Sequence, residues 1–456
     1  MSSGPHAASF RDPAGYVVFD RGLYKRVVAR HGEHDYERLI GSGLYESLVR
    51  DNLLVSHREE TTDLDDVHDQ VHKLLTPAQI HFISYPYEWC FTQLKDAALL
   101  TLQIQERAMS FGMSLKDASA FNVQFHEGRP LFIDTLSFEE DQDRPWVAYE
   151  QFCRHFLAPL SLMRSRSLSL NKLLAVHLDG VPLGLASRLL GVSSYLRPGV
   201  LLHVHLHARA QRSQSRAGEA QQSGRKAKLQ ILRSLRQTIE NLRLPRGTSE
   251  WSEYTTRSDH YPDTSASFKL EYVSRALECV KPGLVYDLGG NAGVYSHLAA
   301  AHGCRCVLYD ADPLCIEHAY LREKESGSGL ILPLVVDLAN PTPAVGLNLS
   351  ERACTFDRAR GSLVLALALV HHLRLRYNIP FRRMADLLAK FGDRLVVEFV
   401  GPDDPMARQM LARKRTPPDD YSLEAFISAF SSRFRLLDRA PIPGMQRTLL
   451  VFACTE

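Results

Sequence analysis

The sequence has few cysteines, and their spacing does not indicate a disulfide scaffold or a zinc site. Eight cysteines occur in 456 residues, too few for a disulfide scaffold. No pair has the Cys-x-x-Cys spacing of common zinc sites. Cys304 and Cys306 flank a single arginine, a spacing that fits a buried strand. We therefore expect reduced, unpaired thiols.

The chain also lacks a targeting segment and any long hydrophobic run. Residues 1–15, MSSGPHAASFRDPAG, have no charged start and no apolar stretch of the kind found in secretory signals. The longest apolar stretches, such as residues 363–370, are far shorter than the ~20 residues that cross a bilayer. We expect a cytoplasmic protein without a transmembrane segment.

Neither sign of charge is in excess. The chain has 54 Lys and Arg against 52 Asp and Glu, a net charge of +2. Because a dedicated nucleic-acid binder is usually more basic, a nucleic-acid partner is disfavoured, and a small molecule or glycan is the expected substrate. The apolar fraction of 45% is typical of globular proteins. The sequence does not predict an oligomeric state.

One internal segment has no large apolar residues. Residues 208–228 contain six Lys or Arg and one Glu. Such a segment cannot bury enough surface to offset its ordering entropy. We expect a basic flexible linker here, between an N-terminal accessory domain over 1–207 and a second domain over 229–456.

The second domain alternates short apolar strands with helices. Strands are expected at 284–290, 304–312, 330–337, within 361–373 and at 394–400, with helices at 267–280, 293–302, 313–324, 381–392 and 421–434. This alternation predicts an α/β doubly wound, mostly parallel sheet, and the last two apolar runs predict a C-terminal antiparallel hairpin.

The first domain is less regular and is expected to be α+β. We predict strands around a glycine turn within 9–28, a long helix over 91–112, a hairpin that turns at Glu127-Gly128, and a helix over 147–163.

The strongest chemical signal lies where the first strand of the second domain meets its helix. The segment reads Asp287-Leu288-Gly289-Gly290-Asn291-Ala292-Gly293. Glycine allows a ligand to approach the backbone, and the helix N-terminus offers free N–H groups. The dinucleotide pattern Gly-x-Gly-x-x-Gly fails, because Asn291 and Val294 stand where glycines are needed. A nucleoside cofactor of another kind is the expected ligand at this sheet edge.

This segment resembles motif I of the class I S-adenosylmethionine-dependent methyltransferases, in its DLG-x-N-x-G form. Asp310 and Asp337 end the next two strands, where the family places a ribose contact and an adenine-side contact. The resemblance implies a Rossmann-like fold and S-adenosyl-L-methionine as cofactor. It implies as binding residues Asp287, Gly289, Gly290, Asn291, Gly293, Asp310 and Asp337. The chain is also similar to bacterial nodulation-type methyltransferases. The alternative is that the acids are helix caps or loop acids.

Two further segments carry candidate bases. Residues 366–373, ALALVHHL, resemble motif IV of that family, and residues 397–405, VEFVGPDDP, resemble the segment of its fifth strand. The candidates are His371, His372, Glu398 and Asp403. Histidine is favoured because its pKa lies near neutrality; a structural or solvated role is the alternative for each.

An aromatic lead-in precedes this domain. Trp251, Tyr254, Tyr261 and Lys269 resemble the entry segment that covers the cofactor in some of these enzymes. Ordinary packing of an N-terminal arm is the alternative.

The first domain contains a second constellation. Asp117 and Asn122 have the Asp-x-x-x-x-Asn spacing of the kinase catalytic loop, and Asp134 follows an apolar strand. This resembles protein-kinase-like and aminoglycoside-kinase-like phosphotransferases. The resemblance implies Asp117 as base, with Asn122 and Asp134 holding the Mg²⁺ of Mg-ATP.

The departures from that pattern are large. Leu115-Lys116 and Thr135-Leu136 replace the family's flanking residues, and no glycine-rich loop is visible. Lys25 is the candidate phosphate lysine. The alternative is an accessory or substrate domain with a polar hairpin.

We therefore expect a methyltransferase that acts on a small molecule or glycan. The alternatives are a bifunctional protein with a kinase-like, ATP–Mg-binding N-terminal domain, and a non-catalytic binding module.

Overall fold

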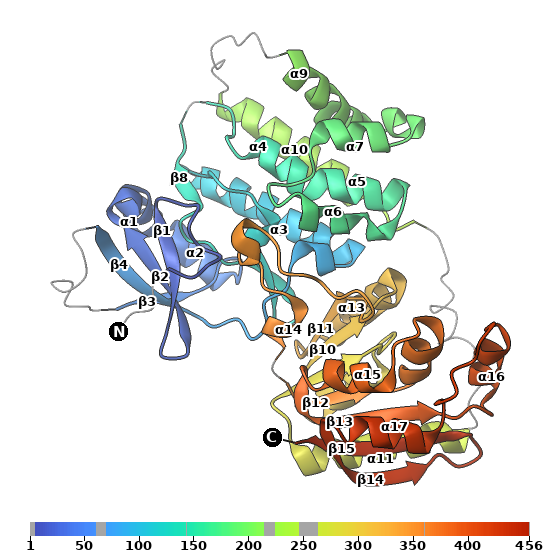
Figure 1. Cartoon of the computed structure of the whole chain (residues 1–456). Helices are drawn as coiled ribbons and strands as arrows, with labels where there is room; N and C mark the ends of the chain where they lie inside the picture. Colours follow the sequence, from blue (N-terminus) through green and yellow to red (C-terminus); the bar gives the residue numbers. More distant parts are fainter. Residues whose placement is uncertain are drawn as a thin grey trace. The chain divides into compact units, whose positions relative to one another are not determined.

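The computed structural model describes residues 5–60, 70–142, 144–213, 224–245, 263–359 and 361–455. Its contacts divide the chain into two compact units (Figure 1). Unit 1 comprises Met1–Arg246 together with Ala344–Arg352, and unit 2 comprises Gly247–Pro343 together with Ala353–Glu456. Trp251, Tyr254 and Tyr261 of the expected lead-in lie outside the described residues, as do residues 214–223 of the expected linker.

Unit 1 begins with a four-stranded antiparallel sheet in the order β1-β2-β4-β3. Its strands are β1 Gly15–Asp20, β2 Leu23–Ala29, β3 His57–Glu59 and β4 Val71–Pro77. Arg21 and Gly22 both have positive φ, as a two-residue hairpin turn requires. The predicted strands around a glycine turn are confirmed. Helices α1 Glu33–Gly41 and α2 Leu44–Arg50 follow β2.

A long buried helix and two short hairpins continue unit 1. Helix α3, Phe91–Ser110, starts where the Gln93 side chain accepts a hydrogen bond from the Cys90 N–H, at 2.9 Å. Strands β5 Met113–Leu115 and β8 Phe138–Glu140 pair, and so do β6 Val123–His126 and β7 Arg129–Phe132. Glu127 and Gly128, both with positive φ, form the β6–β7 turn, as predicted.

A helical layer completes unit 1. Its elements are α4 Tyr149–Phe152, η5 Cys153–Leu157, α5 Ala158–Ser165, η6 Leu168–Lys172, α6 Leu173–Val176, α7 Leu183–Leu189, η7 Val192–Leu196, α8 Pro198–Val200, η8 Leu201–Leu206, α9 His207–Ser213 and α10 Arg225–Asn241.

The structure corrects the expected domain boundary at 228/229. Residues 208–213 and 225–228, at the two ends of the predicted linker, are helical. Helix α10 packs against α3 of unit 1 and buries Leu232, Leu235 and Ile239. The units therefore divide at 246/247. Composition identifies a polar stretch, but it does not say against which helix the next apolar stripe will pack.

Unit 2 is built on a seven-stranded sheet in the order β11-β10-β9-β12-β13-β15-β14. Its strands are β9 Leu284–Leu288, β10 Arg305–Asp310, β11 Ile331–Val335, β12 Gly361–Ala366, β13 Gly392–Val400, β14 Phe434–Pro441 and β15 Arg447–Cys454. The first five are parallel, and β14 and β15 form an antiparallel hairpin paired to β13. The predicted doubly wound sheet with its terminal hairpin is confirmed.

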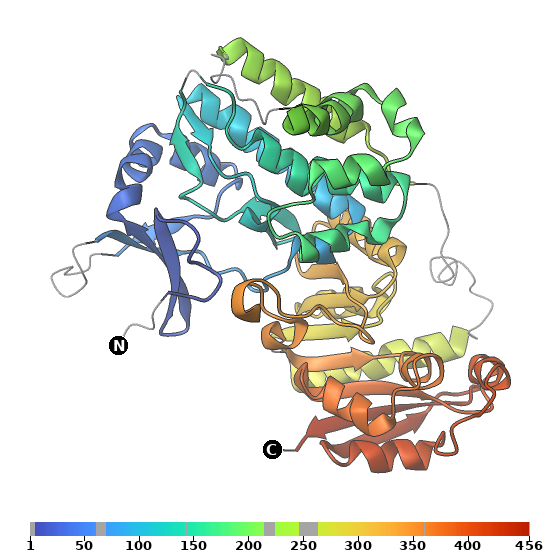
Figure 2. The same ribbon diagram turned by 45° about the horizontal axis from the view of Figure 1, so that its top comes forward.

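Helices cover both faces of this sheet. They are α11 Asp263–Val280, α12 Val294–Ala301, α13 Pro313–Ser326, α14 Thr355–Arg358, η11 His372–Arg376, α15 Phe381–Leu388, α16 Pro405–Ala412 and α17 Leu423–Phe430. Helix α11 contacts α12 on one side, and α15 contacts α17 on the other (Figures 1 and 2).

This topology positions one sheet edge for a ligand. The strand order reverses at β9, whose two neighbours are β10 and β12. Open parallel sheets bind ligands outside the carboxyl ends of their strands at such a reversal. All eight cysteines are unpaired, as expected. Among the described helices, none is both long and apolar enough to cross a membrane.

Candidate functional site

The turn after β9 presents bare backbone to the sheet edge. Gly289 and Gly293 have φ of 71° and 80°, and Gly293 is the N-cap of α12. A Cβ on Gly290 would lie 2.3 Å from Leu308 Cδ1 and 2.5 Å from the Asp287 carboxylate. Side chains are excluded here by backbone conformation at two positions and by packing at the third. A ligand can therefore approach the chain closely.

Asp310 closes this turn from the neighbouring strand. Its Oδ2 accepts a hydrogen bond from the Asn291 N–H and its Oδ1 one from the Asp312 N–H, each at 2.9 Å. Burial raises the pKa of Asp310 to about 6. Each carboxylate oxygen has more than one acceptor site. Asp310 can therefore hold the turn and accept hydrogen bonds from ligand hydroxyls at the same time.

Asp287 and Asp337, the other two strand-end acids, differ in burial and in hydrogen-bond partners. Asp287 is 1% exposed and accepts a hydrogen bond at 2.7 Å from Ser296 Oγ of α12. Burial raises its pKa to about 6. Asp287 therefore braces the start of α12 from beneath the glycines. Asp337 follows β11, is half-buried and accepts the Ala339 N–H at 2.8 Å.

The segment after β12 brings the two candidate histidines to the same edge. His371 is 2% exposed, and its ring lies 3.9 Å from that of His372, centroid to centroid. Within the part of the chain that the structure describes, no hydrogen-bond partner reaches His371 Nδ1. Burial holds the pKa of His371 well below its usual range and lowers that of His372 to about 4. Both imidazoles are therefore neutral at physiological pH, and the lowered pKa makes each a weaker proton acceptor than an ordinary histidine.

Glu398 does not have the role expected of a base. Its carboxylate is fully buried and accepts hydrogen bonds from Lys269 Nζ at 2.7 Å, Arg447 Nη1 at 3.2 Å and the Ala368 N–H at 2.9 Å. Burial alone would raise its pKa, but Lys269 and Arg447 outweigh burial and hold the pKa of Glu398 low. Glu398 instead fixes the loop after β12, where Ala368 has a φ of 52°.

The other acidic candidate, Asp403, lies on the surface. Asp403 has 75% of its side chain exposed, and its nearest cation is Arg408 at 3.7 Å. Its neighbour Asp404 is buried and bonded at 2.6 Å to Arg447. Lys269, the last residue of the expected lead-in, is a buried partner of Glu398. No local spacing signals this network, because its members come from distant parts of the sequence.

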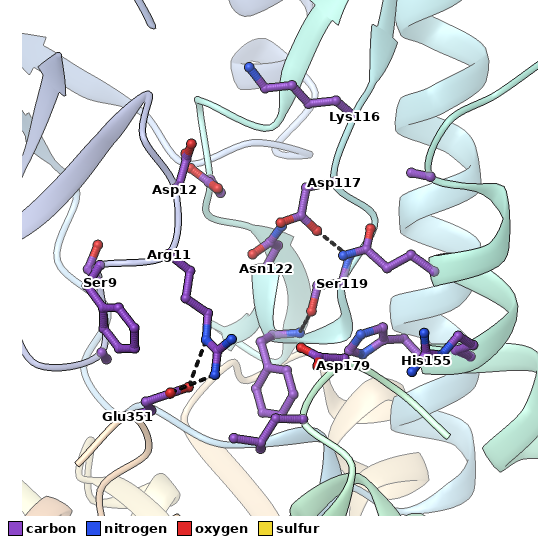
Figure 3. A pocket seen from close by; sticks show the side chains of 18 of the residues that line it. Ser9, Arg11, Asp12, Lys116, Asp117, Ser119, Asn122, His155, Asp179 and Glu351 are labelled. Atoms are coloured by element: carbon purple, nitrogen blue, oxygen red, sulfur yellow. Dashed lines mark hydrogen bonds and ion pairs between the residues drawn. The ribbon is translucent and has the colours of Figure 1, made fainter. Parts of the chain in front are cut away.

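Unit 1 contains a separate polar pocket of about 590 Å³. Asp117, Asn122 and Asp134 all line it, so the three residues singled out by their spacing do face one cavity. Figure 3 shows Asp117 and Asn122 there. Asp117 Oδ1 accepts the Ser119 N–H at 2.9 Å. Burial and, after it, the charge of Asp134 raise the pKa of Asp117.

The Arg26 guanidinium lies beside Asp134, where a Mg²⁺ ion is expected. Arg26 Nη2 lies 2.8 Å from Asp134 Oδ1 and 3.4 Å from Asp12 Oδ2. Lys25, the candidate phosphate lysine, does not line the pocket; it bonds Asp20 and Glu60 instead. The reason is strand geometry, because successive side chains of β2 point to opposite faces.

The expected metal set is not preformed. Among the described residues, no group of three His, Cys, Asp or Glu side chains is arranged to hold a metal ion. Asp134 is engaged by Arg26, and Asn122 Nδ2 donates to Ser137 Oγ at 3.1 Å. Asn122 and Asp134 therefore fit a Mg²⁺ ion only if Arg26 first leaves Asp134.

One wall of this pocket was missed in the sequence. Residues 344–352 belong to unit 1, although they stand between β11 and β12 in the sequence. Glu351 accepts hydrogen bonds from Arg11 Nη2 at 2.7 Å and Nε at 3.2 Å (Figure 3). The Arg352 guanidinium lies 4.4 Å from the centroid of the Phe121 ring. No motif marks this segment, since its residues meet their partners only after folding.

Comparison with solved structures gives partial matches to unit-sized proteins. One is the N-methyltransferase NodS from Bradyrhizobium japonicum WM9, 16% identical, covering 42% of this chain and 98% of that chain with a TM-score of 0.32. Another is the magnesium protoporphyrin IX methyltransferase from Synechocystis PCC 6803, 15% identical, covering 46% and 90% with a TM-score of 0.32.

The similarity in sequence extends over more of the chain. No family model matches the chain. The nodulation protein NoeA from Rhizobium meliloti (strain 1021) is 31% identical over 464 residues, which cover 99% of this chain and 97% of the relative. Unit 2 has the mostly parallel sheet and the glycine turn that the resemblance to class I methyltransferases implied. Because the identity extends over nearly the whole of both chains, this chain belongs to the family of the nodulation protein NoeA.

Proposed function

We propose that the chain is an S-adenosylmethionine-dependent methyltransferase, with its active site at the edge where β9, β10 and β12 end. One observation carries the proposal. The glycine turn and the Asp310 carboxylate meet at the reversal point of a doubly wound sheet, with the neutral His371 on the segment after the adjacent strand. Nucleoside ligands bind at such edges.

The residues at this edge fit the cofactor. The turn from Gly289 to Gly293 has glycine at three of its five positions, and a Cβ at Gly290 would be blocked by Leu308 and Asp287. Asp310 would accept the ribose hydroxyls, and Asp337 would lie on the adenine side. The N-terminus of α12 presents backbone N–H groups to the same edge.

The chain's own residues have two tasks in methyl transfer. The bound cofactor supplies an activated methyl group, so the protein must align the acceptor, and alignment contributes up to about 7–11 kcal/mol in oriented reactions. His371 is the candidate proton acceptor, but burial holds its pKa well below the usual range, so we assign most of the rate enhancement to alignment of the acceptor. Glu398 would keep His371 in place through the Ala368 N–H.

The acceptor is proposed to be a small molecule or a glycan. The net charge of +2 does not favour a nucleic acid.

Calorimetry with S-adenosylhomocysteine on the full-length chain tests this proposal. Asp310→Ala should weaken binding by about 1–3 kcal/mol, the cost of leaving buried hydroxyl groups unpaired. Asp310→Asn, which keeps the side-chain shape, should give a smaller loss, and the exposed control Asp403→Asn none. Failure of the wild-type chain to bind, or equal binding by Asp310→Ala, would remove the cofactor assignment.

A second candidate function concerns the pocket of unit 1. The observation in its favour is that Asp117, Asn122 and Asp134 line one cavity. Phosphoryl transfer needs Asp134 for a metal ion, and Arg26 now holds that carboxylate. A phosphotransferase would therefore require Arg26 to exchange Asp134 for a phosphate; otherwise the pocket is a non-catalytic ligand site.

Thermal unfolding with Mg-ATP separates these two alternatives. A ligand selective for the native state raises the melting temperature by mass action. A shift with Mg-ATP that is absent in Asp134→Asn and larger than with ATP alone would support the kinase-like function. No shift with the wild-type chain would leave the non-catalytic alternative.

A further inference from the structure

The positive charge of the chain is concentrated in the helical part of unit 1. Residues 180–243 hold 11 of the 54 Lys and Arg but only 2 of the 52 Asp and Glu. This segment has a net charge of +9 in a chain whose total is +2, and two of its basic side chains, Lys228 and Arg236, are paired with Asp141 and Glu106 outside it. Charge segregated in this way attracts a partner of opposite sign.

The same region exposes an unusual share of large apolar side chains. Six of the nineteen exposed large apolar residues of the described chain fall within residues 189–206. Val192 and Leu196 are 86% and 85% exposed, and Leu202 is 50% exposed. Single exposed apolar residues are ordinary, but a concentration of them marks an interaction site.

Charge and apolar surface meet on one helical stripe. Elements η8 and α9 form a continuous helix, of which His203, Val204, His205 and Ala208 are buried. Leu202, Leu206 and Arg209 lie on its exposed side, at spacings of four and three residues. Such spacings place side chains along one helix face.

Element η7 packs against η8 at His205. The Tyr195 ring stacks on the His205 ring at 3.9 Å, and Ser194 Oγ is 2.8 Å from His205 Nε2. Helix α7, which ends at Leu189, contacts both η8 and α9. We use the name basic apolar face for eight exposed residues of these elements, which are Arg188, Leu189, Val192, Tyr195, Leu196, Leu202, Leu206 and Arg209.

We propose that the basic apolar face docks on the surface of a membrane that contains anionic lipids. Leucine and valine side chains gain free energy by entering the headgroup boundary, and arginines beside them contact lipid phosphates. Aliphatic side chains have no comparable role against the phosphate backbone of a nucleic acid. From residue 180 to residue 218 no acidic residue would repel the lipid charge. The chain thus lies on the bilayer through unit 1.

Sedimentation of the full-length chain with lipid vesicles tests the proposal. It should bind vesicles of phosphatidylcholine mixed with phosphatidylglycerol, bind pure phosphatidylcholine vesicles far less, and be released by salt. The double variant Leu202→Ser, Leu206→Ser should lose at least tenfold in partitioning. The matched control is Leu437→Ser in unit 2, because Leu437 is 46% exposed against 50% and 43% for the two leucines.

A second variant tests the charges separately. The double variant Arg188→Gln, Arg209→Gln should weaken partitioning about fivefold per arginine, which corresponds to about 1 kcal/mol per charge. The control Arg408→Gln, at an exposed arginine of unit 2, should change nothing. Circular dichroism and the melting temperature show that each variant is folded.

Several results would overturn the proposal. The first is absence of binding to anionic vesicles, and the second is an equal loss of binding in the control variants. The third is self-association of the chain that disappears when the two leucines are replaced, because the partner would then be a second copy. Binding of an RNA duplex that the leucine variant retains, together with unchanged vesicle binding by that variant, would make the face a phosphate site instead.

Discussion

The buried charge network around Glu398 gives the sharpest test of how the catalytic loop is held. In Glu398→Gln the side chain keeps its shape but loses its charge. The wild-type group of Lys269, Glu398, Arg447 and Asp404 is neutral overall, and all four side chains are at most 5% exposed. The variant leaves one positive charge uncompensated in this buried group.

The size of the effect follows from that imbalance. Removing one partner of a buried ion pair costs about 3–5 kcal/mol, because the remaining charge stays desolvated. The Ala368 N–H also loses a charged acceptor, worth about 1.5–3 kcal/mol, and the two losses overlap. We expect the local stability of β12 and β13 to fall by about 3–5 kcal/mol.

Hydrogen exchange read by mass spectrometry measures this stability in peptides of β12 and β13. It reports local opening free energies and needs no two-state transition of a two-unit chain. The double variant Glu398→Gln, Lys269→Met restores neutrality and should recover more than half of the loss. The exposed control Asp403→Asn should stay within about 0.5 kcal/mol of the wild type. A loss below about 1 kcal/mol in Glu398→Gln would refute the assignment and reopen Glu398 as a titrating group.

Three further predictions concern packing and protonation. Gly290→Ala should destabilise unit 2 by about 1–3 kcal/mol in the same assay, because its Cβ would overlap Leu308, whereas Gly283→Ala, with no atom within 4 Å, should be near neutral. Affinity for S-adenosylhomocysteine, measured by calorimetry, should fall as the pH drops below about 6, since protonated Asp310 accepts hydroxyl hydrogen bonds less well; an affinity constant from pH 7 to 5 would contradict this. Burial lowers the pKa of His203 to about 4, below the ordinary 6.5 of the unfolded chain. The contribution of neutral His203 to the folding stability of unit 1 is therefore complete above pH 6.5 and is lost as the pH falls towards 4. His203→Gln should flatten that part of the urea-denaturation pH profile, and an unchanged slope would show that other groups cause it.

Features that depend on neighbouring residues were predictable from the sequence. The turns at Gly22 and Gly128 and the strand-end Asp310 follow from local chemistry, because positive φ and strand termini leave their marks within a few residues. The doubly wound sheet followed from the alternation of strands and helices, since crossover handedness leaves few other arrangements.

Contacts between residues far apart in the sequence were not predictable. Lys25 and Arg26 are adjacent basic residues, and only the pairing of β2 decides that Arg26 reaches Asp134. The sequence presents Glu398 as a candidate base because its partner Lys269 is 129 residues away and nothing local links the two. The segment 344–352 belongs to unit 1 through contacts that no sequence period encodes.

A crystal structure of the full-length chain with S-adenosylhomocysteine is the most direct test of the proposed methyltransferase site. The ribose hydroxyls should lie within hydrogen-bonding distance of the Asp310 carboxylate, against the turn from Gly289 to Gly293. The sulfur should face His371. A ligand bound elsewhere in the chain, or a ribose without contact to Asp310, would contradict the proposed function.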